Sequence, residues 1–210
     1  MRLSENTYHR SLYHLAASLN SSDSHSDVVH SFVKGVARAM EARGCALMLL
    51  TPDRQTLFHA ASFGLSDWFV RKGPVIIDKS MSDTLEGKSL AILDAVNDER
   101  VMYRKQLQQE GLASVLSIPV KLKDTVMGVM RVYTSTQRCF TDDDIKFAVM
   151  AADFGAIALE AADSFNAIQE HFDTFKQDML QWRAELGYEW TGEPAVMPFK
   201  EIEIAIPPGG

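Results

Sequence analysis

The stretch that decides the fold of this chain is EGLASVLSIPVKLKDTVMGVMRVYTSTQRCFTDDDIKFAVMAADFGAIALE, residues 110–160. Residues 113–120 and 126–133 are apolar at most positions, and the five-residue loop between them, 121–125, suits a β-hairpin. Strands that are apolar on both sides need cover on both faces. We therefore expect a hairpin at the centre of a sheet that lies between two other layers.

The helix after this hairpin begins with a capping box. Thr141 can accept a hydrogen bond from the free N–H groups of the first turn, and Asp144 follows three residues later. Asp142 and Asp143 place negative charge where the helix dipole is positive. Because successive side chains on a helix point in different directions, we interpret the three aspartates as a helix cap and not as a metal site.

Upstream of the hairpin, the pattern predicts two helices and a second hairpin. Apolar residues at helical spacing indicate a helix over 8–19, followed by a polar joint at 20–24. A second helix is expected over 28–40, with Gly44 as its left-handed cap. Strands over 45–50 and 57–63 should follow it, joined by a turn that contains proline and aspartate.

The segment 64–109 is irregular, with short apolar pieces at 74–77 and 89–94. A helix is predicted over 99–110, capped by Asp98 and ending at Gly111. Loops supported by a rigid sheet are where binding sites are usually built. We expect a ligand pocket beneath this segment.

The last helix carries two apolar stripes. One should close the core of the domain and consists of Ile145, Val149, Ala152, Ala156 and Leu159. The other alternates spacings of four and three residues, which is typical of a coiled coil. Its members are Phe147, Ala151, Phe154, Ala158, Ala161, Phe165, Ile168, Phe172, Phe175, Met179, Trp182 and Leu186.

The length of this helix predicts a homodimer. A helix over 141–186 would be roughly 70 Å long, whereas the first 160 residues would have a radius of gyration of about 15 Å. Each large side chain of the projecting part stabilises by roughly 1.5 to 3 kcal/mol when buried, and a second copy would bury it. The helix over 8–19 should join this bundle; the alternative is that the long helix turns near Asp163 and folds back on it. The candidate interface is Phe154, Phe165, Ile168, Phe172, Phe175, Met179 and Trp182.

These patterns divide the chain into an N-terminal helix and linker (1–24), a central domain (25–160), a projecting dimerisation helix (161–187) and a proline-rich tail (188–210). Residues 201–206 of the tail, EIEIAI, carry isoleucine at every second position. The tail either docks as a strand on an open sheet edge or stays mobile.

The composition of the chain excludes several classes of protein. The 210 residues are 46% hydrophobic, enough for one well-packed domain and an appendage. A net charge of -7 argues against nonspecific binding to nucleic acid or to anionic membranes. Two cysteines are too few for a disulfide framework. There is no apolar run of about 20 residues and no apolar signal-peptide core, so we expect a cytoplasmic protein.

Over about residues 25–160 the chain resembles the GAF domain family, a group of small-molecule sensory domains. The resemblance lies in the order and spacing of five phrases. They are CALMLLTPDRQTLFHAASFG (45–64), ILDAVNDERVMY (92–103), SVLSIPV (114–120), MGVMRVY (127–133) and RCFTDDDI (138–145). It implies an α+β fold of the PAS and profilin type, with an antiparallel sheet of about six strands, helices on one face and a ligand pocket on the other.

The resemblance also implies where a ligand would lie. In cyclic-nucleotide-binding members the ligand is held at positions that match Ala46, Ser62, Phe63, Met81, Ser82, Tyr103, Leu107 and Arg131. Tyr103 can stack or donate, the two serines can hydrogen-bond, and Arg131 can pair with an anion. The Asn-Lys-Phe-Asp-Glu signature of those members is matched only at Phe140, which argues against a cyclic nucleotide.

Two further candidates have alternatives. Trp68, next to Phe69, either lines the pocket mouth or packs in the core. Asp94 either contacts the ligand or, like Asp98 and Arg100, belongs to a turn. The candidate ligand-binding residues are Ser62, Phe63, Trp68, Met81, Ser82, Asp94, Tyr103, Leu107 and Arg131.

Other members of the family bind bilin, bind heme or reduce free methionine sulfoxide. The bilin and reductase cysteines have no counterpart in 64–109 or at 107–111. His59, expected on the face opposite Phe58 and Ser62, is a poor heme ligand. We therefore expect no bilin and no heme. Cys45 should be buried and inert, while Cys139 leaves a redox role open.

Three hypotheses remain. The favoured one is a noncatalytic sensor in signal transduction, in which an unknown small molecule shifts the packing of the dimer helices. The second is a dimerisation scaffold whose pocket is filled by its own side chains. The third is a thiol-dependent reductase. Because no catalytic domain follows Leu186, a sensor would signal to a separate output protein.

Overall fold

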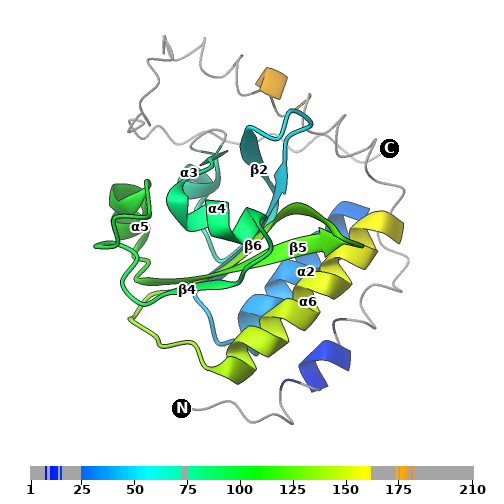
Figure 1. Cartoon of the computed structure of the whole chain (residues 1–210), viewed down its shortest axis with the longest axis horizontal. Helices are drawn as coiled ribbons and strands as arrows, with labels where there is room; N and C mark the ends of the chain where they lie inside the picture. Colours follow the sequence, from blue (N-terminus) through cyan, green and yellow to red (C-terminus); the bar gives the residue numbers. More distant parts are fainter. Residues whose placement is uncertain are drawn as a thin grey trace.

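The computed structural model describes residues 8, 10–13, 15, 25–71, 75–161, 174, 176–178 and 181. Their centre is a six-stranded antiparallel sheet in the order β3-β2-β1-β6-β5-β4. Helices α2 (His25–Ala39) and α6 (Asp142–Ala161) lie side by side on one face (Figure 1). The short helices α3 (Asp67–Val70), α4 (Lys79–Leu85) and α5 (Arg104–Glu110) lie on the other. The predicted α+β architecture is confirmed.

The six strands follow the predicted apolar segments. They are β1 (Gly44–Leu50), β2 (Thr56–Phe63), β3 (Val75–Ile76), β4 (Leu90–Ile92), β5 (Ser114–Leu122) and β6 (Thr125–Thr134). The predicted five-residue loop of the central hairpin is wrong, because Leu122 pairs with Thr125 and only Lys123 and Asp124 remain as the turn. Lys123 takes a positive φ of 54°, and a register shift after Val120 accommodates the shorter turn.

Gly44 is not the cap of α2, which corrects the prediction. The helix ends at Ala39, and the left-handed residue after it is Glu41, with a φ of 49°. Gly44 is the first residue of β1, where a Cβ atom would lie 2.8 Å from the carbonyl oxygen of Phe63. Glycine is needed at this position because β1 and β2 approach closely, and not because a helix ends there.

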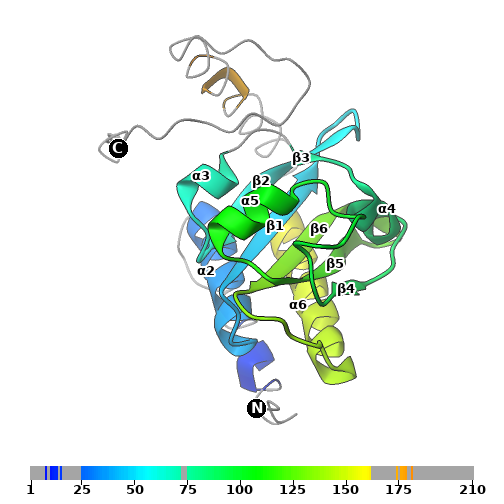
Figure 2. The same ribbon diagram turned by 90° about the vertical axis from the view of Figure 1, so that its left-hand side faces the viewer.

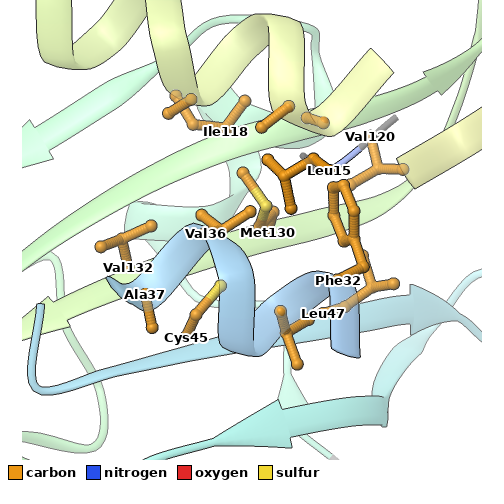
Figure 3. Close-up of a cluster of buried hydrophobic side chains, with 14 of the residues drawn as sticks. Leu15, Phe32, Val36, Ala37, Cys45, Leu47, Ile118, Val120, Met130 and Val132 are labelled. Carbon is orange, nitrogen blue, oxygen red and sulfur yellow. The ribbon is translucent and has the colours of Figure 1, made fainter. Parts of the chain in front are cut away.

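The main core lies between the sheet and the pair α2 and α6. Figure 3 shows Phe32 and Val36 of α2 among Leu47, Ile118 and Met130 of the strands, all fully or almost fully buried. Helix α6 contributes mostly small residues, which lets it lie close to the sheet. Its buried apolar side chains are Phe147, Ala148, Ala151, Ala152, Ala156 and Leu159.

Two residues assigned from the sequence to the dimer seam thus belong to the core of the domain. Phe147 and Ala151 have no solvent exposure within the single chain. The heptad pattern begins this early because α6 has a wide apolar face: α2, the sheet and part of the N-terminal segment all pack against it. Phe154, the next seam residue, is half-buried against the same core.

The N-terminal segment docks at the start of α6. Tyr8, Leu12 and Leu15 are buried, and the ring of Tyr8 stacks on Phe147 with centroids 4.5 Å apart. The Tyr8 hydroxyl donates a hydrogen bond to Asp144. The predicted capping box is also present, since the Thr141 amide donates to Asp144 Oδ2 at 2.8 Å and the Asp144 amide to Thr141 Oγ1 at 3.2 Å.

The predicted dimerisation helix and tail fall outside the described residues, apart from residues 174, 176–178 and 181, which are helical. The interface residues that cannot be placed for this reason are Phe165, Ile168, Phe172, Phe175, Met179 and Trp182. Within the part of the chain that is described, no helix combines the length and apolar character needed to cross a membrane.

Candidate functional site

A row of small side chains and one arginine crosses the sheet beneath the short helices. Ser62 pairs with Ala46, Ala46 with Arg131, and Arg131 with Ser117. Directly paired residues of neighbouring strands project from the same face. Figure 2 looks onto this face, with α4 and α5 in front of the strands and α6 behind them. Arg131 is therefore flanked by residues that leave its long side chain room.

Arg131 is buried at the centre of a polar cluster, with only 4% of its surface exposed. Its Nε donates to Ser117 Oγ at 2.9 Å, and its Nη2 donates to Ser80 Oγ of α4 at 2.7 Å. Ser80 in turn donates to Asp78 Oδ1 at 2.6 Å. We call Arg131, Ser117, Ser80 and Asp78 the Arg131 cluster. No carboxylate of the described residues forms a direct ion pair with Arg131.

Asp78 connects this cluster to two other segments. Its Oδ1 accepts from the Met81 amide at 3.0 Å, which caps α4, and its Oδ2 accepts from the Met102 amide at 2.9 Å. The Ser80 amide also donates to the Arg100 carbonyl. The guanidinium on β6 is thus joined through Ser80 to the start of α4 and to the loop that precedes α5.

Apolar side chains surround the cluster on both sides. Met81 and Tyr103 pack with Met48, Leu57, Val75 and Val129. The Tyr103 hydroxyl accepts from the Ile76 amide at 3.1 Å. Burial raises the pKa of Tyr103, which therefore remains a neutral phenol at physiological pH.

The second apolar group lies under α3 and α5. Leu107, Phe69 and Tyr133 are buried there, and Trp68 is half-buried against them. Phe69 meets Tyr133 edge to face at 5.9 Å. Burial raises the pKa of Tyr133, while the charge of Arg131 and a hydrogen bond with it act in the opposite direction. The Tyr133 phenol therefore lies close to the cluster.

Two predicted site residues do not face the cluster. Ser82 is exposed on the outer side of α4, and the serine that reaches Arg131 is Ser80. Phe63 lies on the opposite face of the sheet, against α2, with the Lys34 and Arg38 cations 5.9 and 5.8 Å from its ring centroid. The alternation of β2 separates it from its neighbour Ser62.

Asp94 belongs to a turn. It accepts hydrogen bonds from the Asn97 side chain at 2.9 Å and from Gln137 at 2.9 Å. Asp98 pairs with Arg100 at 2.6 Å, and this hydrogen-bonded pair lowers the pKa of Asp98.

The helix predicted over 99–110 is shorter than expected. It begins at Arg104, because Asp98 caps the Arg100 amide in a turn and not a helix. Its predicted end at Gly111, in a left-handed conformation, is confirmed.

His59 lies on the same face as Ser62, which corrects the expected orientation. A register shift between Leu47 and Met48 leaves Ala60 unpaired, and Met48 then pairs with His59. Met48 faces the short helices, so His59 does too. Simple alternation fails here because a β-bulge inserts one residue, and nothing in the composition of β2 marks the bulge.

The cysteines lie away from the cluster. Cys45 is buried on the helix-pair face, and burial raises the pKa of its thiol far above the ordinary value. Cys139 is exposed in the loop before α6. Among the described residues, no group of histidine, cysteine, aspartate and glutamate side chains is placed to hold a metal ion.

Sequence reasoning missed three members of the cluster: Asp78, Ser80 and Ser117. Asp78 stands three residues before Met81 at the start of a helical segment, which is a usable cap signal. Ser117 is a polar residue inside an apolar strand, so it needed a partner. That the partner is Arg131 follows from the strand register, which the sequence alone does not provide.

Comparisons with known proteins agree with this fold. The model of the GAF domain family matches residues 24–159. The chain belongs to the GAF domain family. Such domains are typical of the sensory and regulatory parts of signalling proteins. No curated protein sequence gives a significant match to the chain.

Several solved structures of GAF folds are similar to this domain. The GAF domain of a phosphoenolpyruvate-protein phosphotransferase from Coxiella burnetii has a TM-score of 0.70 at 18% identity, covering 78% of this chain and 99% of its own. The corresponding Acinetobacter domain has a TM-score of 0.64 at 23% identity, covering 78% and 98%. The free methionine-R-sulfoxide reductase of Neisseria meningitidis has a TM-score of 0.62 at 12% identity, covering 78% and 95%. At these identities the likeness concerns the fold.

Proposed function

We propose that this GAF domain protein is a noncatalytic sensor that binds a small molecule at the Arg131 cluster. The observation that carries the proposal is the guanidinium of Arg131, which is buried on the sheet without a directly paired carboxylate in the described part of the chain. A buried charge costs free energy that structural needs alone seldom justify. A few charged or polar side chains placed beneath loops that a sheet supports are typical of binding sites.

Several predicted residues support the site. Ser62 and Arg131 belong to one row of the sheet, Met81 and Tyr103 form one wall, and Leu107 with Trp68 belongs to the other. No cysteine lies in this set, since Cys45 is on the opposite face and Cys139 precedes α6. This arrangement suits recognition and offers no thiolate nucleophile.

The signal would leave through the helices on the other face. Arg131 lies on β6, and Met130 and Val132 of that strand pack into the core shared with α6. Helix α6 lies on β5, which Ser117 joins to Arg131, so a change at Arg131 would reach α6 through β5 and with it the predicted dimer seam. In this proposal a homodimer passes the change to a separate output protein.

A second candidate is a scaffold whose pocket is filled by its own side chains. The observation in its favour is that Met48, Met81, Tyr103 and Val129 are all buried in mutual contact on the binding face. Such a domain would hold its partner helices without responding to a ligand.

The test separates these two candidates. The full-length protein is purified under mild conditions and examined by native mass spectrometry for a molecule carried from the cell, and by thermal melting against a metabolite library. A sensor should carry a ligand or gain several degrees in Tm with one class of compound. Absence of both, with a structure showing the face filled by side chains, would establish the scaffold.

A further inference from the structure

We infer that the Arg131 cluster recognises a small oxyanion, the carboxylate or phosphate group of a metabolite. This inference rests on the proposed ligand-binding function and names the chemistry of the ligand. It is argued from the hydrogen-bond donors and acceptors that are buried together beneath α4.

Donors exceed acceptors at this site. The only carboxylate of the cluster, Asp78, already accepts from three donors: the Ser80 hydroxyl and the amides of Met81 and Met102. Arg131 uses Nε and Nη2 for the two serine hydroxyls and also donates to the Tyr133 phenol, and its remaining N–H groups are further donors. Tyr133, which accepts from Arg131, keeps its own O–H as a donor.

Thr84 is an independent sign of a missing acceptor. It is fully buried on α4, and its Oγ1 has no hydrogen-bond partner. Thr84 stands four residues after Ser80, so the two hydroxyls share one face of the helix, about 6 Å apart along its axis. Ser80 contacts Arg131, and this face of α4 is packed against β5 and β6. A buried hydroxyl without a partner destabilises the fold unless a ligand or a water molecule forms a hydrogen bond with it.

A negatively charged group that only accepts hydrogen bonds would satisfy the excess donors of the Arg131 cluster. A carboxylate or phosphate oxygen accepts several hydrogen bonds and neutralises a guanidinium, whereas a neutral amide would bring further donors to a site that already has too many. The residues paired with Arg131 on the sheet, Ala46 and Ser117, have small side chains and bring no carboxylate that would compete for the guanidinium.

The experiment measures binding to the full-length protein by calorimetry and by the shift in Tm. The probes are sodium phosphate, acetate and pyruvate at matched ionic strength, with sodium chloride as an anion that lacks oxygen and acetamide as the uncharged comparison. The inference predicts that at least one oxyanion binds and that chloride and acetamide do not. Phosphate and the two carboxylates distinguish the two sources of the oxyanion.

Variants connect the effect to this site. Thr84→Val removes an unpartnered hydroxyl while keeping the side-chain shape, so it should fold normally and weaken oxyanion binding about tenfold or more. Arg131→Gln should abolish binding. Arg104→Gln, which removes an exposed positive charge from α5, is the matched control and should bind as the wild type does.

The outcomes separate the two proposals. Equal responses to acetate and acetamide, or unchanged oxyanion binding by Thr84→Val and Arg131→Gln, would overturn the oxyanion inference. Binding of a neutral metabolite to both the wild type and Arg131→Gln would also overturn the oxyanion inference. That result would leave the sensor proposal standing. Both proposals fail if no library compound binds and a crystal structure shows an ordered water hydrogen-bonded to the Thr84 hydroxyl.

Discussion

Asp144 holds the N-terminal segment against the domain through its hydrogen bond with Tyr8. Burial alone would raise the pKa of its carboxyl, but hydrogen bonds from Tyr8 and Thr141 and the charge of Arg138 outweigh burial and lower the pKa. Arg138 lies 2.7 Å from Asp144 Oδ1 and also donates to the Met40 carbonyl at the end of α2. One carboxylate thus joins the N-terminal segment to both large helices.

We predict that Tyr8→Phe lowers the free energy of unfolding by about 1.5 to 3 kcal/mol, the usual value of a hydrogen bond to a charged group. The ring would still stack on Phe147, so the loss reports on the hydroxyl. Urea unfolding of the variant and the wild type at pH 7 measures it. Equal stability of the two proteins would show that the segment is not docked through the Tyr8 hydroxyl.

The stability linked to Asp144 should depend on pH in one direction. Because its pKa is lower in the folded protein than the ordinary 3.8, its contribution is fully present above that value and is lost as the pH falls below it. The wild type should therefore lose more stability between pH 5 and pH 3 than Asp144→Asn does. Parallel acid-unfolding curves for the two proteins would contradict this assignment.

Two glycines should respond very differently to alanine. A Cβ atom on Gly128 would lie 2.1 Å from the Met48 carbonyl oxygen, a backbone atom that cannot move away, so Gly128→Ala should cost about 3 kcal/mol or more. Gly111 has a φ of 72° and no atom near its added Cβ, so Gly111→Ala should cost only about 1 to 2 kcal/mol. Thermal melting of both variants gives the comparison, and a mild effect at Gly128 would mean that β1 and β6 pair less closely.

At the scale of elements, periodicity predicted the strands and the long helices because apolar burial dominates their formation. β1, β2, β5 and β6 all coincide with apolar runs. It failed where one backbone detail decides the outcome: the turn at Lys123, the bulge near Ala60 and the start of α5 at Arg104. Arg131 came from the family resemblance, and Ser80 was missed because its contact with Arg131 depends on how α4 lies over the sheet.

Helix α6 offers the clearest test of an element, because its apolar face was divided differently by the sequence and by the structure. Phe147 is fully buried in the domain core, so Phe147→Ala should cost about 3 to 5 kcal/mol whatever the protein concentration. Ile157 is 55% exposed, and Ile157→Ala should change the stability of the domain by no more than about 0.5 kcal/mol. If the loss of stability in Phe147→Ala grew as the protein was diluted, Phe147 would belong to a dimer interface.

For the whole molecule, the open question is what covers the apolar stripe that continues beyond α6. Seven large apolar residues follow Glu160 at coiled-coil spacing, from Phe165 to Leu186. The core of the domain is already filled by α2, α6 and the docked Tyr8 segment. A second copy of the chain remains the partner that the repeat favours, since its own seam has the same pattern.

We therefore predict a dimer at micromolar concentration, measured by light scattering of the full chain. Phe172→Asp places a charge in the seam and should convert the dimer to a monomer while leaving the fold of the GAF domain intact by circular dichroism, because burying an unpaired charge costs several kcal/mol. Gln177→Asp is the control, since Gln177 is exposed and lies between the seam positions 175 and 179. A monomeric wild type, or a Phe172→Asp variant with the mass of the wild type, would show that the stripe is covered within the chain.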